Sequence, residues 1–574
     1  MLNIRIVLLL TMLSLSLSFN AINIRNDIKI LQLNGNGFDI RGEVIKNDEA
    51  FWLSNEKAYY IGYGFARYIA KRCNNEADIK IGIGRDTRNS GIILSSYFRA
   101  GIEDAGSKAY DVGIVSTPAM YCSCSNEYNV DSTDTIITDS NAENVDKKLS
   151  TKAMNHAVPW PFHGAVSITA SHLPSKYNGF KLFTKECSVG IGSDGIDQLI
   201  SEITDDSIKN LQPHPSKSVV TWNYLDNYCA FLKNTIKSLH PNGQSSKPLK
   251  GLKVVVNPGH GVGFMLPKLL AELGADTDSS IHINIDEENP KHVANPEDKT
   301  AMRFTRDAVL NSNADIGICL DTDGDRSGVI DSDGRILNRN GFIALISKIS
   351  IKNPGDIIVS DSSTSSGLTK YVESLGGKLI RYKKGYRYVI GLASNTAGCV
   401  AGFEASGHGG FKNHHWIDDG IYSSIRVLIE LHSLRLSTNN PKASISDIIK
   451  GFKEPCESHE IRLNMLTGTS HESREAATQK SCAELRSVVK NIENWSEEGV
   501  NHEGLRIMIN YNQPNEGWLM IRASLHEPIL SLQLESDLPG GSKEILKQLL
   551  SNGFDNLEQQ NILDLQPIRN FINT

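Results

Sequence analysis

Residues 314–337, ADIGICLDTDGDRSGVIDSDGRIL, form two apolar runs separated by an acidic loop. Asp321, Asp323 and Asp325 occupy alternate positions of that loop, and Gly324 provides a turn between the last two. Three carboxylates this close together repel one another unless a cation lies among them. Carboxylate oxygens are ligands that Mg²⁺ prefers, and Mg²⁺ keeps open positions for phosphate oxygens. The loop therefore predicts a magnesium site between two strands, with a solvated acidic turn as the alternative.

An alternation of apolar runs and helical patterns extends outward from this loop, beginning near Ile30, and predicts an α/β fold. A chain of 574 residues is too long for one hydrophobic core. Breaks near Pro213–Val219, Leu337–Gly341 and Asn440–Glu454 predict four domains. Their ranges are 31–218, 219–337, 338–453 and 454–574, and the last has a different mixture of elements.

The stretch between Ser125 and Trp160 interrupts the alternation. It is rich in Asn, Asp, Ser and Thr and predicts a mobile surface insertion. The net charge of −7 argues against nucleic acid as the main partner, because binding to a phosphate backbone needs a basic surface. A small anionic substrate remains compatible, since an acidic protein can contain a basic cleft.

The nine cysteines are scattered, and none forms a Cys-x-x-Cys pair. Cys319 lies inside the apolar run IGICL. We expect buried free thiols rather than a disulfide framework or a zinc site. Free thiols of this kind suit a reducing compartment.

The N-terminal residues 1–30 have the layout of a targeting peptide. Arg5 precedes an apolar stretch from Ile6 to Leu17, which is short for a membrane span. A buried N-terminal helix is the alternative. Because no other segment approaches 18 apolar residues, we expect no membrane association of the mature form. A signal peptide on a thiol-rich chain favours a plastid reached through the secretory route, with a transit peptide beginning near Phe19; a cytoplasmic or secretory-lumen location is the alternative.

The stretch AVSITASH places Thr169, Ser171 and His172 at the end of a strand, where α/β proteins bind ligands. Taken singly, Ser171 could be an ordinary turn residue and His172 a structural histidine. Cations in other polar turns favour a phosphate-binding site around Ser171, because guanidinium groups hold phosphate in bidentate fashion. These cations are Arg41, Arg85, Arg88 and Lys181.

Three further Gly- or Ser-containing loops are candidates for binding. GFEASGHGG places Glu404, Ser406 and His408 at alternate positions, suited to a polyhydroxylated ligand, although a Gly-rich loop with an incidental His is the alternative. RASLHEP, residues 522–528, is a plausible phosphate cradle. NPGHGVG, residues 257–263, lacks the G-x-G-x-x-G spacing of dinucleotide-binding folds, so we expect no nucleotide there.

In this order the motifs resemble those of the α-D-phosphohexomutases, the phosphomannomutase/phosphoglucomutase family. The matching motifs are FDIRG, TASHLP, DTDGDR, FEASGH and the following DDGIYSS, and the resemblance spans nearly all of residues 34–550. It implies four domains around a central cleft, three related mixed-sheet α/β domains and a smaller C-terminal α+β domain.

The resemblance also implies roles for single residues. Ser171 would be the phosphoserine, and its phosphate would bind Mg²⁺ together with Asp321, Asp323 and Asp325. Arg41 would face the transferring phosphate, and Lys181 and His408 would serve general acid/base catalysis. Substrate contacts would come from Arg85, His172, Arg326, Lys383, Glu404, Ser406, Arg522 and Ser524.

The activity implied is the interconversion of hexose 1- and 6-phosphates, of mannose or glucose, through a 1,6-bisphosphate. Mg²⁺ would be the cofactor, glucose 1,6-bisphosphate the activator, and the protein a monomer or homodimer. Phosphoryl transfer needs mainly positioning and charge neutralisation, which a metal and several cations supply. Phosphoglucosamine mutase, a non-catalytic sugar-phosphate-binding paralogue and a metal-dependent phosphomonoesterase remain as alternatives.

Some residues depart from the family pattern. Leu173 stands where the family commonly has Asn, Phe403 replaces a Gly, and Leu525 and His526 replace a small polar pair. The insertion before Trp160 is also longer than usual. Similar changes occur in plastid-type plant and algal members, which agrees with the expected location and leaves the preferred sugar open.

Overall fold

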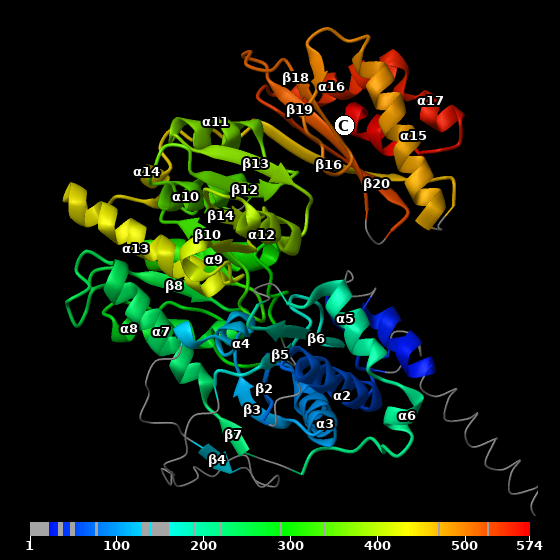
Figure 1. Ribbon diagram of the computed structural model, residues 1–574. Coiled ribbons are helices and arrows are strands. Elements are labelled where there is room, and N and C mark those ends of the chain that lie inside the picture. The colour runs from blue at the N-terminus through cyan, green and yellow to red at the C-terminus, as the bar shows by residue number, and fades with distance from the viewer. Residues whose placement is uncertain are drawn as a thin grey trace, which may run out of the picture. The chain divides into compact units, whose positions relative to one another are not determined.

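The computed structural model describes residues 22–32, 38–45, 52–74, 78–128, 137–139, 160–186, 190–217, 220–286, 290–337, 339–468, 471–524 and 527–574. These fall into two compact units (Figure 1). The first unit comprises Met1–Leu337, Ser406–Gly410 and His414–Ile448, and the second comprises Asn338–Ala405, Phe411–Asn413 and Ile449–Thr574. Each unit is described by itself.

A mixed sheet of seven strands forms the first part of the first unit, in the order β1-β6-β5-β2-β3-β7-β4. Strand β2 pairs in parallel with β5 and β3, whereas β6 pairs antiparallel with both β1 and β5. The strand bounds are Ile40–Glu43 (β1), Lys80–Arg85 (β2), Lys108–Ile114 (β3), Ile137–Asp139 (β4), Gly164–Ile168 (β5), Tyr177–Thr184 (β6) and Val220–Trp222 (β7).

Helices α2 (Asn55–Arg72) and α3 (Ser90–Asp104) run side by side against this sheet (Figure 1). Their backbones approach each other closely at Gly101. A Cβ on Gly101 would lie 2.0 Å from the carbonyl oxygen of Tyr59. Glycine is therefore required at this crossing. Three more helices belong to this part: α4 (Thr117–Cys122), α5 (Gly192–Ser201) and α6 (Asp205–Ile208), with a 3₁₀ turn at Asn126–Tyr128.

The predicted hairpin around the acidic loop is confirmed. β9 (Ile316–Leu320) and β10 (Ser327–Asp331) pair antiparallel with Leu320 opposite Ser327, so the acidic residues form the connection. The sheet has the order β11-β10-β9-β8, with β8 at Val254–Asn257 and β11 at Ile336–Leu337. The helices of this part are α7 (Tyr224–Leu239), α8 (Met265–Glu272), α9 (Lys299–Ser312), α13 (Gly420–Thr438) and α14 (Ile445–Ile448), with a 3₁₀ turn at Val262–Phe264. Of a further 3₁₀ turn, Lys412–His414, only His414 is counted in the first unit.

The second unit holds two further sheets. One has the order β13-β12-β14-β15, and β12 pairs in parallel with β13 and with β14. Its strands are Ile357–Asp361 (β12), Lys378–Tyr382 (β13), Cys399–Phe403 (β14) and Gly409–Phe411 (β15), and its helices are Asn340–Ser350 (α10), Ser366–Ser374 (α11) and Tyr386–Asn395 (α12). Of β15, only Phe411 is counted in the second unit.

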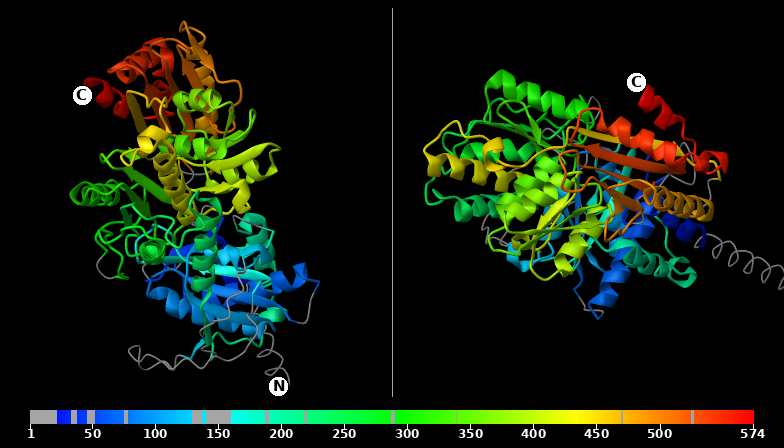
Figure 2. Two further views of the ribbon diagram at one scale, coloured as in Figure 1. Left: turned by 90° about the vertical axis from the view of Figure 1, so that its left-hand side faces the viewer. Right: turned by 90° about the horizontal axis from the view of Figure 1, so that it is seen from above.

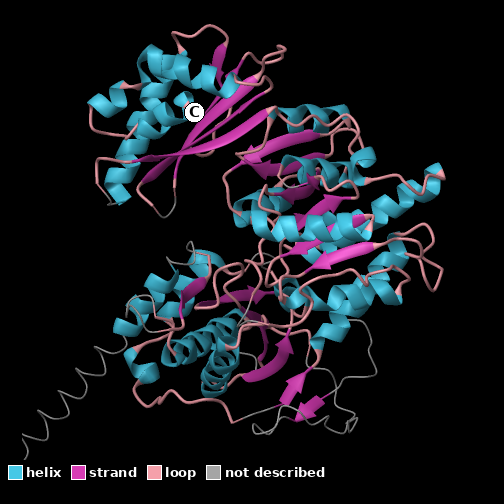
Figure 3. Ribbon diagram, turned by 180° about the vertical axis from the view of Figure 1, so that it is seen from behind, coloured by secondary structure: helices cyan, strands magenta, loops and turns pink. Residues whose placement is uncertain are grey.

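The C-terminal sheet is antiparallel throughout, in the order β16-β20-β19-β18-β17. Its helices form a layer on one face, which includes the C-terminus (Figure 2, Figure 3). This α+β arrangement confirms the predicted fold class. The strands are Glu457–Asn464 (β16), Trp495–Glu497 (β17), Leu505–Ile509 (β18), Gly517–Ala523 (β19) and Ile529–Ser536 (β20); the helices are His471–Val489 (α15), Gly541–Leu549 (α16), Asn556–Gln559 (α17) and Gln566–Asn573 (α18), with a π turn at Leu550–Phe554.

Residues 22–32 form a helix that packs on the first sheet's helical layer. Ile24, Ile28 and Leu31 are buried in the same core cluster as α2 and α5. The Asp27 carboxylate lies 3.1 Å from the Lys57 ammonium. The boundary predicted at residue 30 therefore falls inside a packed helix, and the buried-helix alternative describes residues 22–30. Residues 1–21, which carry the apolar stretch of the predicted targeting peptide, lie outside the described residues.

The structure describes only part of the residues on which the predictions about the insertion, the cysteines and membrane association rest. The predicted mobile insertion falls outside the described residues except for residues 126–128 and β4. All eight described cysteines are free thiols; five are buried, Cys73 and Cys229 are half-buried and Cys456 is exposed. Cys187 is not among the described residues. Of the helices that the structure describes, none has both the length and the apolar character needed to cross a membrane.

Candidate active site

Ser171 lies in the turn that follows β5, with a backbone φ of +53° and a nearly buried side chain. Its amide donates to the Thr169 hydroxyl at 2.8 Å, which holds the left-handed turn. The Ser171 hydroxyl donates to Asp321 Oδ2 at 3.1 Å and lies 3.1 Å from Arg326 Nη2. The structure thus joins two motifs that are 150 residues apart in the sequence.

Arg88 holds the Ser171 turn through the backbone carbonyl oxygens of residues 171–177. Its buried guanidinium donates to the carbonyl oxygens of Leu173 at 2.7 Å, Pro174 at 2.9 Å and Tyr177 at 3.1 Å, and also to that of Ser171. The Asp86 carboxylate pairs with Arg88 Nε at 2.9 Å and keeps the fork oriented. From the sequence, Arg88 was predicted only as one of several cations near Ser171. The spacing Asp-x-Arg at a strand end was the available signal for its pairing with Asp86.

The carboxylates of Asp321, Asp323 and Asp325 are buried and close enough to one another to share a metal ion. The Oδ1 atoms of Asp323 and Asp325 have no hydrogen-bond partner among the described residues. Asp321 Oδ1 accepts from the amides of Gly324 and Arg326, each at 3.1 Å, so this carboxylate is fixed by the turn itself. Buried carboxylate oxygens without donors fit a hard cation, and the donor set suits Mg²⁺.

Lys181, on β6, lies against these carboxylates. Its ammonium donates to Asp323 Oδ2 at 2.8 Å and also to Asp325 Oδ2. Burial alone would raise the pKa of Asp323, but the Lys181 charge outweighs it and holds that pKa below the ordinary range. Burial and the Asp323 charge raise the pKa of Asp325 to about 6. Burial, with the charges of Asp325 and Asp323, raises the pKa of Asp321 well above its ordinary value.

Thr117, at the start of α4, positions the acidic loop, and sequence analysis missed it. Its amide donates to the Asp323 carbonyl oxygen at 2.9 Å and its hydroxyl donates to Asp323 Oδ2 at 2.7 Å. Pro118 follows at the second helical position and Ser116 caps the helix. The Ser-Thr-Pro sequence was a signal for a helix start, but nothing in it indicated a partner 206 residues away.

His172 and Arg326 meet beside the Ser171 hydroxyl. Burial and the charges of Arg326 and Arg41 lower the pKa of His172 to about 2, so the imidazole is neutral. Its Nδ1 accepts from Arg326 Nη2 at 2.5 Å. Arg326 Nε also donates to Asp321 Oδ2 at 2.9 Å, and its Nη1 donates to Asn295 Oδ1 at 3.2 Å.

His408 reaches the same group of carboxylates. Its Nδ1 lies 2.7 Å from Asp418 Oδ2 and 3.7 Å from Asp325 Oδ1. The preceding Gly407 has a φ of +93°, and a Cβ there would lie 2.5 Å from the Ser327 carbonyl oxygen. The loop therefore approaches β10 closely enough to need glycine.

The remaining residues predicted for the first unit make fewer contacts with the Ser171 turn. Arg41 on β1 pairs with Asp39 at 2.6 Å, and its charge acts on His172. Arg85 packs its stem near Gly91, and burial lowers its pKa. Its charge interacts with Asp111 and Asp86, whereas Arg88 is the guanidinium that reaches the Ser171 turn. Ser406 is buried at the start of the segment that belongs to this unit.

Four predicted residues belong to the second unit. Glu404 is buried, and its carboxylate accepts from the Gly385 amide. Lys383 is exposed, with its ammonium 5.8 Å from the centre of the Tyr388 ring. Arg522 is the next-to-last residue of β19. The Ser524 amide, just after the strand, donates to the Ile529 carbonyl oxygen at 2.8 Å. The departures at 525 and 526 lie outside the described residues.

Family models match three consecutive parts of the chain. They are described as phosphoglucomutase/phosphomannomutase alpha/beta/alpha domains I, II and III, and match residues 34–207, 226–334 and 338–453.

The chain belongs to the phosphohexomutase family. As a member, it is a hexose phosphate mutase, an isomerase-class phosphotransferase.

Curated relatives agree with this membership. A phosphomannomutase/phosphoglucomutase of Pseudomonas putida is 28% identical over 504 residues, which cover 87% of this chain and 91% of the relative. A phosphoglucomutase of Neisseria gonorrhoeae is 26% identical over 512 residues, covering 88% and 94%. A phosphoglucosamine mutase of Dinoroseobacter shibae is 28% identical over 402 residues, covering 69% and 79%.

Solved structures share the fold. A phosphoglucomutase/phosphomannomutase family protein of Burkholderia thailandensis has a TM-score of 0.66 at 24% identity, with 90% of this chain and 96% of that chain covered. The Paramecium phosphoglucomutase parafusin has a TM-score of 0.62 at 14% identity, covering 91% and 94%. An Aspergillus fumigatus N-acetylphosphoglucosamine mutase, solved with GlcNAc-6P and magnesium, has a TM-score of 0.51 at 13% identity, covering 93% and 99%.

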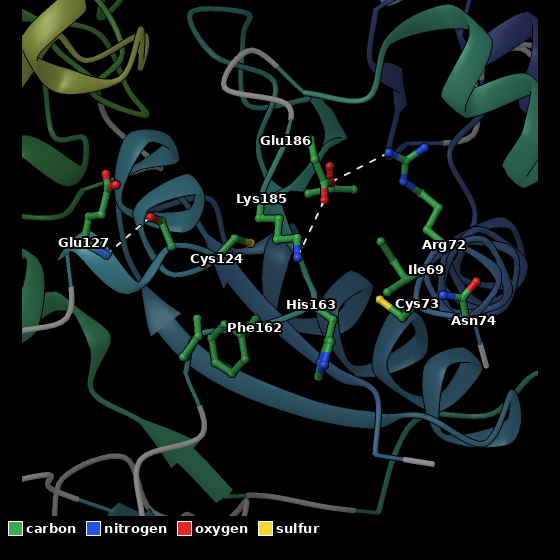
Figure 4. A pocket seen from close by; sticks show the side chains of 13 residues that line it. Ile69, Arg72, Cys73, Asn74, Cys124, Glu127, Phe162, His163, Lys185 and Glu186 are labelled. Atoms are coloured by element: carbon green, nitrogen blue, oxygen red, sulfur yellow. Dashed lines mark hydrogen bonds and ion pairs between the residues drawn. The ribbon is translucent and has the colours of Figure 1, made fainter. Parts of the chain in front are cut away.

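Cavities bordered by described residues of the phosphohexomutase's first unit include the following two. One, of about 390 Å³, borders the Ser171 turn and is lined by Arg88, His172, Leu173, Gly259, His260 and His292, among others. The other, of about 760 Å³, contains none of the predicted site residues (Figure 4). Its wall carries Ile69, Cys73 and Phe162, and its charged side chains Arg72 and Lys185 pair with Glu186 at 3.7 and 3.9 Å.

Proposed function

We propose that this mutase interconverts the 1- and 6-phosphates of mannose, glucose or both, through a phosphorylated Ser171 and a hexose 1,6-bisphosphate. The place of the Ser171 hydroxyl, 3.1 Å from Asp321 Oδ2 and 3.1 Å from Arg326 Nη2, carries this proposal. A hydroxyl between a metal-binding carboxylate and a guanidinium suits phosphoryl transfer, because the charge of the group is neutralised on both sides. The relatives named above as phosphomannomutases and phosphoglucomutases support the two sugars.

Asp321, Asp323 and Asp325 would hold Mg²⁺ together with an oxygen of the Ser171 phosphate. The two Oδ1 atoms without hydrogen-bond partners support this assignment. Bound there, Mg²⁺ would neutralise the charge of the phosphate and polarise its oxygens. The Arg326 guanidinium, held by Asp321 and Asn295, would keep the phosphate in line from the other side.

The chain's own residues account for the proton that transfer releases. As the bond between Ser171 Oγ and phosphorus breaks, a bond forms between phosphorus and a sugar hydroxyl oxygen, and the hydroxyl proton must leave. The His408 imidazole, held by the Asp418 carboxylate 2.7 Å from its Nδ1, would accept that proton. The Lys181 ammonium is the second candidate, as the group that returns a proton to Ser171 Oγ.

The sugar must then present its other phosphate to Ser171, so binding contacts that tolerate two orientations are needed. Glu404 and Ser406 would accept and donate hydrogen bonds to sugar hydroxyls, and Arg522 and Ser524 would hold the phosphate that does not react. Arg41, Arg85, His172 and Lys383 would add contacts to the phosphates. We propose glucose 1,6-bisphosphate as the activator that phosphorylates Ser171.

A coupled assay with Mg²⁺ and a trace of glucose 1,6-bisphosphate tests the function. Mannose 1-phosphate, glucose 1-phosphate and glucosamine 1-phosphate are offered side by side, and conversion of the first two is expected. Glucosamine 1-phosphate as the preferred substrate would favour a phosphoglucosamine mutase. Release of inorganic phosphate without isomer would favour a phosphomonoesterase, and no conversion of any sugar would favour a binding protein.

Targeting and assembly are proposals of their own. We propose a plastid location reached through the secretory route, supported by Arg5 and the apolar stretch Ile6–Leu17. A fluorescent protein fused behind residues 1–40 should enter plastids, and a cytoplasmic or luminal signal would refute this. We propose a monomer or homodimer, which light scattering of the purified protein would check.

A further inference from the structure

We propose that the first unit carries a second metal site, distinct from the acidic loop, which takes a divalent transition-metal ion such as Zn²⁺. Its ligands are His282 Nδ1, His292 Nε2 and Asn257 Oδ1, and the His260 ring lies beside the His282 ring. Asn257 ends β8, Gly259 and His260 form the turn after it, and His282 and His292 come from the segment before α9.

The three ligand atoms form a nearly equilateral triangle. His282 Nδ1 lies 3.1 Å from Asn257 Oδ1, His292 Nε2 lies 3.2 Å from the same oxygen, and the two nitrogens are 3.2 Å apart. With metal–ligand bonds of about 2.0–2.1 Å, tetrahedral ligands are about 3.3 Å apart. The triangle therefore has the size of one face of a tetrahedral site.

The hydrogen bonds around the triangle orient its nitrogens. His292 Nδ1 lies 2.8 Å from the Val293 carbonyl oxygen, which can only accept, so Nδ1 carries the proton and Nε2 keeps its lone pair. A backbone carbonyl bound to the far nitrogen is the usual support of a metal-ligating histidine. Asn257 Nδ2 donates to Thr305 Oγ1 at 2.9 Å, which turns Oδ1 of the amide toward Gly259 and the histidines.

His260 supplies an independent observation. Its Nδ1 lies 2.7 Å from the Asn284 carbonyl oxygen, so its Nε2 is the nitrogen with the lone pair. That Nε2 is a buried atom without a hydrogen-bond partner among the described residues. Buried polar atoms are nearly always satisfied, so an acceptor left without a donor needs an explanation. The His260 ring lies 5.2 Å from the His282 ring, and the His282 ring lies 4.9 Å from the His292 ring.

Without an ion, the same atoms hydrogen-bond to one another. Asn257 Nδ2 lies 3.1 Å from His292 Nε2 and donates to it, and the proton on His282 Nδ1 is shared with its neighbours. Metal binding requires that this His282 proton moves from Nδ1 to Nε2, and that the Asn257–His292 bond is given up. Binding is therefore expected to be reversible.

The ion has a route to the site and would act on its surroundings. The cavity of about 390 Å³ is lined by Gly259, His260 and His292 and also reaches His172. A metal ion bound to Asn257 and His292 would connect the turn after β8 to the segment that contains His292 and Asn295. The side-chain amide oxygen of Asn295 accepts a hydrogen bond from Arg326 Nη1 at 3.2 Å. Occupancy would thus stabilise the partner of an arginine that lies beside Ser171.

The ligand chemistry separates this site from the acidic loop. Imidazole nitrogens favour Zn²⁺, Co²⁺, Ni²⁺ and Cu²⁺, whereas carboxylate oxygens favour Mg²⁺. The test is equilibrium dialysis of the chelator-treated full chain against Zn²⁺ in excess Mg²⁺, followed by metal analysis. We expect one retained Zn²⁺ per chain, and a Co²⁺ complex with the visible absorption of nitrogen-ligated cobalt.

Variants assign the retained ion. H282A and H292A should each lose affinity at least about tenfold. Asp321→Asn, which damages the acidic loop, and His214→Ala, which removes a histidine elsewhere in the same unit, should keep the ion. The proposal is overturned if no Zn²⁺ is retained, if Asp321→Asn alone releases it, or if thiol alkylation releases it.

A measurement on the unaltered protein guards against variants that fail to fold. Anomalous diffraction from a zinc-soaked crystal should place the ion among His282, His292 and Asn257. A peak at Asp321–Asp325 alone, or at a cysteine alone, would refute the site. Zn²⁺ should also raise the midpoint of thermal unfolding of the wild type and leave that of H292A unchanged, and an equal shift in both would count against it.

Discussion

The Nη2 atom of Arg88 donates to the carbonyl oxygen of Leu173 at 2.7 Å, two residues beyond the hydroxyl of Ser171. The same guanidinium reaches three more carbonyl oxygens of the turn, from Ser171, Pro174 and Tyr177. Only the rigid fork of an arginine can serve so many acceptors at once. The position of the Ser171 hydroxyl therefore depends on a side chain that does not touch it.

Arg88→Lys is expected to lower kcat by about 10²-fold with little change in KM, because small displacements of a reacting group cost that much. Steady-state kinetics measure both constants. Guanidinium ion added at low concentration should restore part of the activity of Arg88→Ala, whereas a purely structural loss would not respond. Arg99→Lys, at a buried arginine that pairs with Asp111 at 3.2 Å, is the matched control. Wild-type kcat in Arg88→Lys would contradict the positioning role.

Ser171→Ala should abolish the phosphorylated form and reduce mutase activity by about 10³-fold or more, as removal of a nucleophile does. Mass spectrometry of the wild type incubated with glucose 1,6-bisphosphate should find phosphate on Ser171. Phosphate on another serine, or full activity in the variant, would remove the phosphoserine mechanism.

Thr117→Val should raise the Mg²⁺ concentration needed for half-maximal activity by about tenfold, because it removes the hydroxyl that holds Asp323 Oδ2 at 2.7 Å. Thr117→Ser keeps a hydroxyl and should behave nearly as the wild type. Titration of activity with Mg²⁺ gives both values. Equal Mg²⁺ requirements in Val and Ser variants would show that the hydrogen bond is unimportant.

The stability of the first unit should fall as the pH drops from about 6.5 to about 4. His240 Nε2 lies 2.9 Å from His432 Nδ1, and burial together with His432 lowers the pKa of His240 to about 4. The unfolded chain takes up a proton below an ordinary histidine pKa of about 6.5, while the folded chain does not, so unfolding is favoured in this window. Each such proton contributes up to about 1.4 kcal/mol per pH unit.

Urea unfolding at several pH values measures this slope. His240→Gln should make the slope shallower between pH about 6.5 and about 4. An unchanged slope in His240→Gln would assign the pH dependence to other groups.

Ile28→Ala should lower the free energy of unfolding by about 2–5 kcal/mol, since Ile28 is fully buried in the core beside α2. Ile22→Ala is the control on the same helix, because the Ile22 side chain is 48% exposed. Chemical denaturation compares the two variants. Equal stability would mean that the helix over residues 22–32 contributes little to the core.

Parts of the fold and the site could be predicted because their signals are local. The acidic loop is a hairpin whose three carboxylates are neighbours in sequence, and the alternation of apolar runs marks the α/β units. Arg88 and Thr117 could not be assigned, since their partners lie 85 and 206 residues away. The helix at 22–32 was divided at residue 30 because an apolar N-terminal run fits both a targeting peptide and a buried helix.

The left-handed backbone at Ser171 restricts which alcohol can accept phosphate there. Threonine has the same hydroxyl, but its second Cβ branch is strongly disfavoured at a φ of +53°. A Ser171→Thr exchange would keep the phosphoacceptor oxygen and still be opposed by the backbone. Backbone geometry, as well as chemistry, therefore selects serine at this position.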